Sequence, residues 1–140
     1  MRNILIDAGP LIALFDGDDQ FHEKTVAYLK NFQGRLITTW PVITETAHML
    51  DFSIQTQLHL FEWIELGGLT IFDLNASHLR NIRSITEKYS DLPADLADVT
   101  LLITAQELNV REIITFDSDF EVFRLDNGDS LENVVDSRHT

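Results

Sequence analysis

Short apolar runs alternate along this chain with longer segments in which apolar residues recur every three or four positions. The first run, Ile4-Leu5-Ile6, is closed by Gly9 and Pro10. A short apolar run that ends in Gly and Pro is typical of a buried strand in a parallel sheet. We therefore predict the first strand at residues 4–6 and further strands at the similar runs 35–40, 69–74 and 112–117.

Helical periodicity fills the segments between these runs. Apolar spacing and capping or turn residues predict helices that begin near Pro10, His22, Pro41, Ser53 and Asn75, and one more within residues 91–110. The helix after Ser53 carries an apolar stripe made of Ile54, Leu58, Phe61 and Ile64. Leu60 and Trp63 fall off that stripe, so we expect them either in an interface with another protein subunit or buried deeper in the helix layer.

This alternation predicts an α/β fold with three layers. A central, mostly parallel sheet of four to five strands would carry helices on both faces. Residues 121–125 are expected to add an edge strand, and the polar, acidic segment 126–140 is expected to be a peripheral tail. The length of 140 residues, 44% of them hydrophobic, suits a single domain over 1–140 with its own core.

Two carboxylates lie where the predicted strands end. Asp7 follows the first strand and Asp117 ends the fourth. In open α/β sheets, binding sites form beyond the carboxyl ends of the strands, near the point where the strand order reverses. Glu45 and Asp98 lie on predicted helices, at positions that can face the same edge. The sequence therefore predicts that four carboxylates from distant parts of the chain converge.

Most of these acids also have a purely structural explanation, which the sequence leaves open. Asp98 and its neighbour Asp95 lie in the first turn of a predicted helix, where the helix dipole favours negative charge by about 0.3–1 kcal/mol. The same explanation applies to Glu45, and Asp117 suits an ordinary turn. Asp7 is the hardest to explain in this way, because an acid at the end of a buried strand has no evident structural purpose.

The charge balance bears on what such a cluster would bind. The net charge of −13, from 23 acids against 10 Lys and Arg, argues against a simple basic surface for nucleic acid, although not against a binder that uses bound cations. Clustered carboxylates repel one another, and the four acidic segments contain no Lys or Arg. One or two divalent cations with a preference for oxygen ligands, Mg²⁺ or Mn²⁺, are therefore the expected partners.

Other features of the composition narrow the class of protein. The chain has no cysteine, so neither a disulfide framework nor a thiolate metal site is available. No apolar run approaches the roughly 20 residues that span a bilayer, and Asp7 interrupts the run nearest the N-terminus. We expect a cytoplasmic protein that has no membrane partner.

Four segments, taken in order, resemble the acidic motifs of the PIN-domain nucleases: ILIDAGPLIALFD, ITETAHML, DLADVTLLITA and IITFDSDF. The resemblance covers about residues 1–125 and is greatest to the small single-domain members, which include the VapC-type toxins of toxin–antitoxin pairs. It implies a PIN-like fold and a Mg²⁺- or Mn²⁺-dependent endoribonuclease that hydrolyses RNA phosphodiester bonds, as the toxin of a type II pair.

The same resemblance implies roles for individual residues. The catalytic acids would be Asp7, Glu45, Asp98 and Asp117, the metal ligands Asp7, Asp98, Asp117 and Asp119, and the accessory residues Thr115 and Asp95. Asp95 competes with Asp98 for one role, because both belong to the same motif. One departure is Gly9, where many relatives have Ser or Thr, so a hydroxyl contact to metal-bound water or phosphate is in doubt.

Partners follow from the resemblance as well: an RNA substrate, a protein antitoxin and a second copy of the chain in a homodimer. Two alternatives stay within the family, namely a PIN nuclease of RNA processing that is not a toxin, and an inactive PIN-like module that only binds. A phosphoacceptor receiver domain also clusters acids at strand ends, but it needs a lysine after a late strand, and ITFDSDF contains none.

Overall fold

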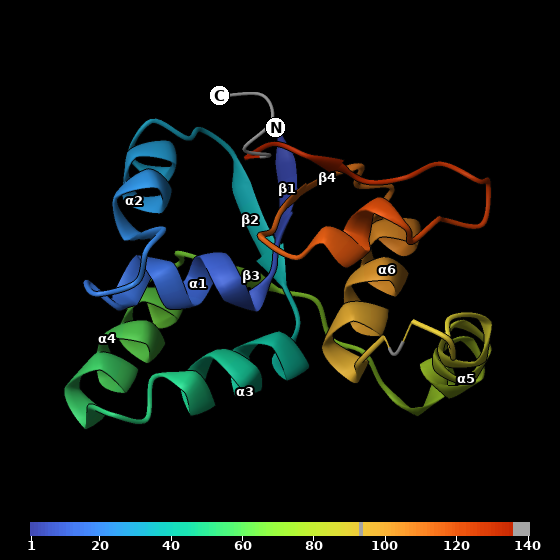
Figure 1. The fold of residues 1–140 in the computed structure, drawn as a ribbon, viewed down its shortest axis with the longest axis horizontal. Helices are drawn as coiled ribbons and strands as arrows, with labels where there is room; N and C mark the ends of the chain where they lie inside the picture. The colour runs from blue at the N-terminus through green and yellow to red at the C-terminus, as the bar shows by residue number, and fades with distance from the viewer. Residues whose placement is uncertain (93, 136–140) are drawn as a thin grey trace.

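The computed structural model of this chain describes residues 1–92 and 94–135. At its centre is a sheet of five parallel strands in the order β3-β2-β1-β4-β5 (Figure 1). The strands are β1 (Asn3–Ile6), β2 (Arg35–Thr38), β3 (Thr70–Ile71), β4 (Glu112–Ile114) and β5 (Glu132–Asn133). The predicted α/β fold with a parallel sheet of four to five strands is therefore confirmed.

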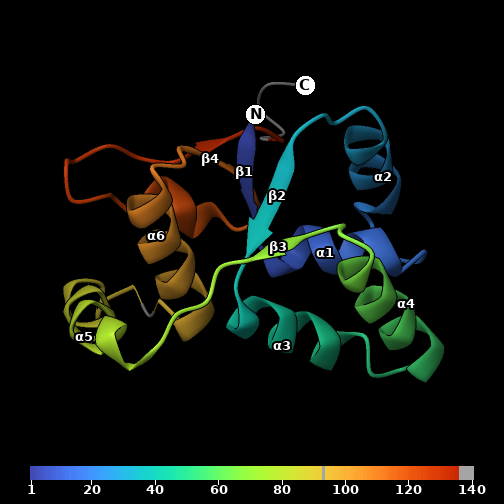
Figure 2. The same ribbon diagram turned by 180° about the vertical axis from the view of Figure 1, so that it is seen from behind.

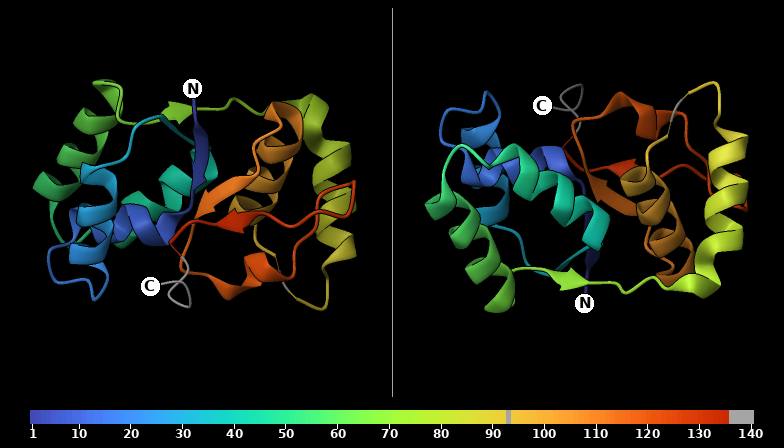
Figure 3. Two further views of the ribbon diagram at one scale, coloured as in Figure 1. Left: turned by 90° about the horizontal axis from the view of Figure 1, so that it is seen from above. Right: turned by 90° about the horizontal axis from the view of Figure 1, so that it is seen from below.

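Helices cover both faces of this sheet. The described helices are α1 (Ala8–Phe15), α2 (His22–Lys30), α3 (Trp40–Met49), α4 (Ile54–Glu65), α5 (Leu79–Lys88) and α6 (Leu96–Leu108), with short 3₁₀ turns η1 (Ala76–His78) and η2 (Ser118–Glu121). Helices α1, α2 and α4 lie on one side of the sheet, and α6, with α5 on its outer side, lies on the other (Figures 2 and 3). Helix α3 lies near the carboxyl edge and contacts both α1 and α6.

The middle strand explains why its sequence is a continuous apolar run. Strand β1 pairs with β2 on one side and with β4 on the other, and helices cover both of its faces. Ile4, Leu5 and Ile6 consequently have no exposed surface. A strand that is buried on both faces needs apolar residues at consecutive positions. Each such side chain stabilises the fold by roughly 1.5–3 kcal/mol when buried.

Local signals set several helix boundaries. Ser53 caps α4 because its hydroxyl accepts the backbone N–H of Thr56 at 3.2 Å, as predicted. Pro41 lies in the first turn of α3, where its missing N–H costs nothing. Asn109 ends α6 in the left-handed conformation, with φ 55°, which Asn tolerates better than most residues. Each of the described helices is too short or too polar to cross a lipid bilayer.

The strand order places an opening beside β1. The chain runs from β1 outward to β2 and β3, and then returns to β4 on the other side of β1. The strand order therefore reverses between β1 and β4, so the segments that leave their carboxyl ends diverge. Asp7 directly follows β1, and Asp117 lies three residues beyond Ile114, the end of β4.

The expected structure after η2 is wrong in two respects. Residues 121–125 are not an edge strand, because η2 ends at Glu121, a turn follows at Val122, and residues 123–125 form neither helix nor strand. The segment from Asp126 is not a peripheral tail as far as residue 135, because β5 lies within it and pairs with β4. Leu131 and Val135 are buried there. Residues 136–140 of the expected tail lie outside the described residues.

Of the two alternatives for Leu60 and Trp63 on α4, deeper burial in the helix layer is confirmed. Leu60 has no exposed surface, and Trp63 packs edge-on against Phe15 with ring centroids 5.5 Å apart, so these two residues face the inside of the protein. Three residues of the apolar stripe face outward, with exposed fractions of 71% for Ile54, 50% for Leu58 and 45% for Phe61, whereas its fourth member, Ile64, packs against the core. Apolar residues surround much of this helix, so their spacing alone did not identify the buried side.

Candidate active site

Asp7 occupies the junction between β1 and α1 at the carboxyl edge of the sheet. Its backbone N–H donates to the carbonyl of Ile114 at 3.0 Å, which continues the pairing of β1 with β4. Its Oδ1 caps α1 by accepting the N–H of Ala8 at 2.8 Å. Its Oδ2 accepts the hydroxyl proton of Thr115 at 2.9 Å. These contacts hold the carboxylate, which is only 7% exposed, in one orientation.

Thr115 connects Asp7 to Asp117. The Thr115 hydroxyl donates to Asp7 and accepts the backbone N–H of Asp117 at 3.0 Å, and the residue is buried. Asp117 in turn caps η2, because its Oδ1 accepts the backbone N–H of Asp119 at 2.9 Å. The hydroxyl expected at this site therefore orients the carboxylate of Asp7 and holds the backbone of Asp117.

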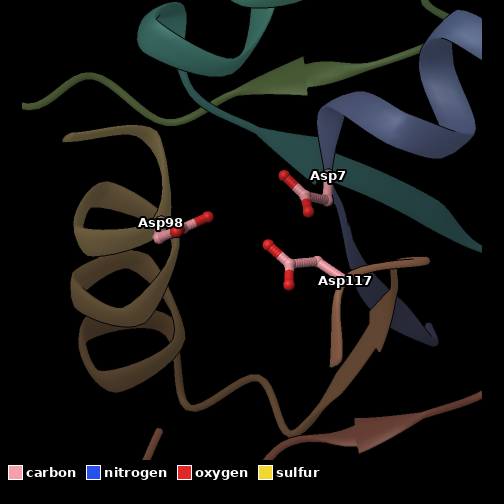
Figure 4. A group of neighbouring side chains, drawn as sticks. All are labelled: Asp7, Asp98 and Asp117. Atoms are coloured by element: carbon pink, nitrogen blue, oxygen red, sulfur yellow. The ribbon is translucent and has the colours of Figure 1, made fainter. Parts of the chain in front are cut away.

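Helix α6 brings Asp98 to the site from the other side. Its N-cap is Asp95, whose carboxylate accepts the backbone N–H of Asp98 at 2.9 Å. Asp98 itself is 7% exposed, and its side chain extends from the first turn of the helix toward Asp7 and Asp117 (Figure 4). The two acids of this motif thus do different things: Asp95 caps the helix, and Asp98 faces the other carboxylates.

Asp7, Asp98 and Asp117 form one group. Each offers a carboxylate oxygen, and these three oxygens lie within 4.8 Å of one another. Figure 4 shows the side chains pointing into a common space from the end of β1, from α6 and from the loop after β4. Three of the four acids that were predicted to converge are therefore brought together by the fold.

The surroundings make two of these carboxylates, those of Asp7 and Asp98, hard to ionise. Burial raises the pKa of Asp7 to about 6, although hydrogen bonds from Ala8 and Thr115 act in the opposite direction. Burial also raises the pKa of Asp98, to about 8, and the negative charges of Asp95, Asp7 and Asp117 raise it further. Among the described residues, the charges that act on these two carboxyl groups are all negative. Their ionised forms therefore need a cation that the described part of the chain does not supply.

The group lies in a hollow of about 480 Å³ at the carboxyl edge. Five acids line it, namely Asp7, Glu45, Asp95, Asp98 and Asp117, and none of its described lining residues is Lys, Arg or His. Phe116 and Ser118 line it as well. Both belong to the segment IITFDSDF, but sequence reasoning singled out only the acids and Thr115 of that segment, because a Phe and a Ser carry no charge that points to a site.

The remaining predicted residues lie around the group of three. Glu45 lines the same hollow from α3 but is exposed and not one of the three converging acids. Its pKa is raised, first by burial and then by the charges of Asp95 and Asp117. Asp119 is not among the residues that line the hollow, and its backbone supports Asp117. The donor set is thus three close carboxylates with a fourth at the rim.

Such a donor set suits a hard divalent cation. Mg²⁺ and Mn²⁺ prefer carboxylate oxygens and keep coordinated water when the protein supplies only a few ligands. The described residues that line the hollow include neither Cys nor His, whose thiolate and imidazole groups softer metals would favour. The arrangement can therefore bind a divalent cation and present it to a substrate that enters the hollow.

Comparison with known proteins identifies relatives along most of the chain. The family model described as the PIN domain matches residues 4–124. A curated relative from Methanocaldococcus jannaschii, ribonuclease VapC6, is 26% identical over 144 aligned positions, which cover 85% of this chain and 91% of that protein.

Two solved structures have a similar fold. Mycobacterium tuberculosis VapC20, described as a toxin that cleaves the sarcin-ricin loop, superposes with a TM-score of 0.76 at 16% identity over 85% of this chain and 93% of that chain. VapBC2 from Rickettsia felis, bound to a DNA fragment from its promoter, gives a TM-score of 0.60 at 14% identity over 86% of this chain and 92% of that chain. At these identities the likeness concerns the fold alone.

Proposed function

Since the chain belongs to the PIN domain family, we propose that it is a metal-dependent endoribonuclease and the toxin of a toxin–antitoxin pair. The observation that carries the nuclease proposal is the convergence of Asp7, Asp98 and Asp117, whose carboxylate oxygens lie within 4.8 Å of one another in a hollow lined by no described cation. A phosphodiester is an anion, so a hollow with this charge accepts RNA only when a cation is present.

The residues that would hold the ions are Asp7, Asp98 and Asp117, with Asp119 as a further acid in the same loop. Mg²⁺ and Mn²⁺ both fit a donor set made only of carboxylates, as one or two ions. When bound, such an ion lowers the pKa of coordinated water and offsets negative charge on the phosphodiester. Because Ala8 and Thr115 orient Asp7 and Thr115 also fixes the backbone of Asp117, the protein holds these ligands in place before the ion arrives.

Glu45 and Asp98 have separate places in this proposal. Asp98 is buried and joins the ion-binding group, whereas Asp95 is engaged as the helix cap. Glu45 is exposed on α3 across the hollow, with a raised pKa that suits a group exchanging protons with substrate or water. Glu45 therefore completes the catalytic quartet from the substrate side.

The toxin part of the proposal is supported by the relatives. One is named a VapC ribonuclease, and one structural neighbour is a VapC toxin described as cleaving the sarcin-ricin loop. The other neighbour is a VapBC pair bound to promoter DNA. A protein antitoxin is accordingly the proposed partner of this chain, and RNA is its proposed substrate.

A second copy of the chain is a further proposed partner. Three residues of α4 that face outward are apolar, namely Ile54, Leu58 and Phe61, and Met49 and Phe52, shortly before them in the chain, have exposed fractions of 55% and 63%. An apolar surface of this kind is typical of a protein interface. Light scattering after size exclusion should find a dimer in the wild type and a monomer in Leu58→Lys. A wild-type monomer at high concentration would contradict the homodimer.

RNA cleavage tests the nuclease proposal directly. The protein is stripped with EDTA, supplied with Mn²⁺ or Mg²⁺, and incubated with a mixed-sequence RNA. We expect cleavage by the wild type with metal and none without it. Asp98→Asn should be inactive, whereas Asp126→Asn, which removes one exposed acid outside the hollow, should remain active. Full metal-dependent cleavage by Asp98→Asn would refute the assignment of the site.

A further inference from the structure

A second hollow adjoins the acidic one. It has a volume of about 510 Å³, within the range of small-ligand sites. Phe116, Asp117 and Ser118 line both hollows, so the second begins where the acidic group ends. From there it extends to Asn133, at the end of β5. When a phosphate of an RNA strand lies at the acids, the neighbouring nucleotide can reach this second hollow.

One wall of the second hollow is aromatic. The rings of Phe21 and Phe116 are stacked, with centroids 4.3 Å apart and an angle of 27° between their planes. Phe116 packs against the core, and Phe21 stacks on it from the start of α2. Both rings remain partly exposed where they line the hollow. A nucleobase can bind to such a wall, because every nucleobase has a face that stacks on aromatic rings.

The charges in the second hollow are divided. Lys24 lies one helical turn after Phe21 and is the only Lys or Arg among the described residues that line either hollow. Glu121 and Glu132 line the hollow as well and repel an anion. A phosphate group therefore has one favourable position, beside Lys24, while a base has the aromatic wall.

We propose that the second hollow is a nucleotide subsite of the RNA-binding surface. In this subsite, the base next to the cleaved bond stacks against Phe21 and Phe116. An adjoining phosphate binds beside Lys24. This inference rests on the proposed ribonuclease function and extends it, because it names binding residues outside the acidic group. Phe21 and Lys24 bind RNA and touch none of the reacting atoms, so their removal weakens binding rather than the chemical step.

The first test compares steady-state cleavage of a short RNA by the wild type, Phe21→Leu and Lys24→Gln in Mn²⁺. Phe21→Leu keeps an apolar side chain but loses the ring, so KM should rise about 5- to 30-fold with kcat nearly unchanged, as expected for one lost stacking contact. Lys24→Gln should raise KM and make the salt dependence of kcat/KM shallower by about one phosphate contact. Lys30→Gln, on the same helix outside both hollows, is the matched control and should behave as the wild type.

The second test locates the base. Once the cut is mapped, an abasic nucleotide is moved along the RNA one position at a time. In the wild type, one position beside the cut should raise KM by a factor similar to that of Phe21→Leu. In Phe21→Leu the same abasic position should have little further effect, because the contact is already absent. Equal abasic effects in both proteins, or wild-type KM in both variants, would overturn the subsite.

These outcomes are separable from failure of the nuclease proposal. If the wild type does not cleave RNA in Mn²⁺, the nuclease proposal fails, and the subsite is then measured by fluorescence anisotropy with a labelled RNA of ten nucleotides. Weaker binding by Phe21→Leu and Lys24→Gln than by Lys30→Gln would support the subsite on its own. Equal affinities would overturn it. Circular dichroism and melting curves establish that each variant is folded.

Discussion

The charged residues at the amino ends of β1 and β4 pair with each other, whereas those at the carboxyl ends are all acids. At the amino ends, Arg2 and Glu112 form a paired contact, with N–O distances of 3.0 and 2.8 Å, and the Arg2 guanidinium also lies 5.9 Å from the centre of the Phe32 ring. At the carboxyl ends, Asp7 and Asp117 face Asp98 with no described cation among them. The same two strands therefore display one balanced and one unbalanced set of charges.

The pKa values follow this difference. The hydrogen bond from Arg2 lowers the pKa of Glu112, whereas burial raises the pKa of Asp7 to about 6. A lowered pKa means that the protein stabilises the ionised acid, and a raised pKa means that it does not. The charges at the amino edge are thus paired within the chain, and we propose that an ion from solution pairs those at the carboxyl edge.

Loss of activity should show the largest difference between the two edges. Asp98→Asn removes an ion ligand and should reduce Mn²⁺-dependent RNA cleavage by roughly 100-fold or more, whereas Glu112→Gln should leave it within about twofold. Initial rates on one RNA measure both. Comparable losses in the two variants would mean that the carboxyl edge has no special part in the reaction.

Stabilisation by metal should be the next largest effect. An ion that binds only the folded protein, at a concentration 100 times its dissociation constant, adds about 2.7 kcal/mol to the free energy of unfolding. Mn²⁺ should therefore raise the melting temperature of the wild type and of Glu112→Gln, but not that of Asp7→Asn. Equal shifts in Asp7→Asn and the wild type would place the ion elsewhere.

The pH dependence of stability should have opposite signs at the two edges. Because the folded-state pKa of Asp7 lies above its ordinary value of 3.8, the metal-free folded protein holds this proton more tightly than the unfolded chain does. Stability should then increase as the pH falls from 8 to 5, by about 1 kcal/mol from Asp7 alone, with a contribution of the same sign from Asp98. Urea unfolding in EDTA measures this increase, which Asp7→Asn should diminish.

Glu112 should behave in the reverse manner. Its pKa is below the ordinary value of 4.5, so its pairing with Arg2 stabilises the fold above that pH and is lost as the pH falls through the lower folded-state value. The pH range in which Asp7 changes the stability lies above the range in which Glu112 does. Unfolding measured across one pH series therefore resolves both effects. A free energy of unfolding that falls steadily from pH 8 to 5 in the metal-free wild type would contradict this difference between the two edges.

The smallest effect should come from the exposed ion pair itself. Arg2→Gln removes the contact with Glu112 at a site where the Arg2 side chain is 47% exposed. Pairs of this kind contribute about 0.2–1 kcal/mol and weaken in salt. Urea unfolding at low and high salt should show a loss of that size that shrinks in high salt, with no change in metal binding.

The contrast also shows which parts of the structure the sequence could predict. The apolar run 4–6 identified β1, because a strand covered on both faces has no freedom to include polar residues. The position of Asp7 after that run then followed from chain connectivity. Convergence with Asp98 and Asp117 followed from the rule that sites form where the strand order reverses, without any knowledge of distances.

The wrong and the undecided predictions arise where local pattern does not determine tertiary packing. Helix α4 has apolar residues on several sides, so only contacts such as Trp63 with Phe15 decide which side is buried. Strand β5 has two residues, Glu132 and Asn133, and neither is apolar; its place in the sheet comes from pairing with β4. The stacking of Phe21 on Phe116 joins two loops far apart in sequence, and no local signal predicts such a contact.

The most direct test is a crystal structure of the protein grown or soaked in Mn²⁺, with anomalous diffraction to locate the ion. We expect an anomalous peak enclosed by the carboxylates of Asp7, Asp98 and Asp117, with no peak beside Arg2 and Glu112. Well-ordered carboxylates at these three positions with no peak among them, at a Mn²⁺ concentration that supports cleavage, would contradict an ion as the missing positive charge.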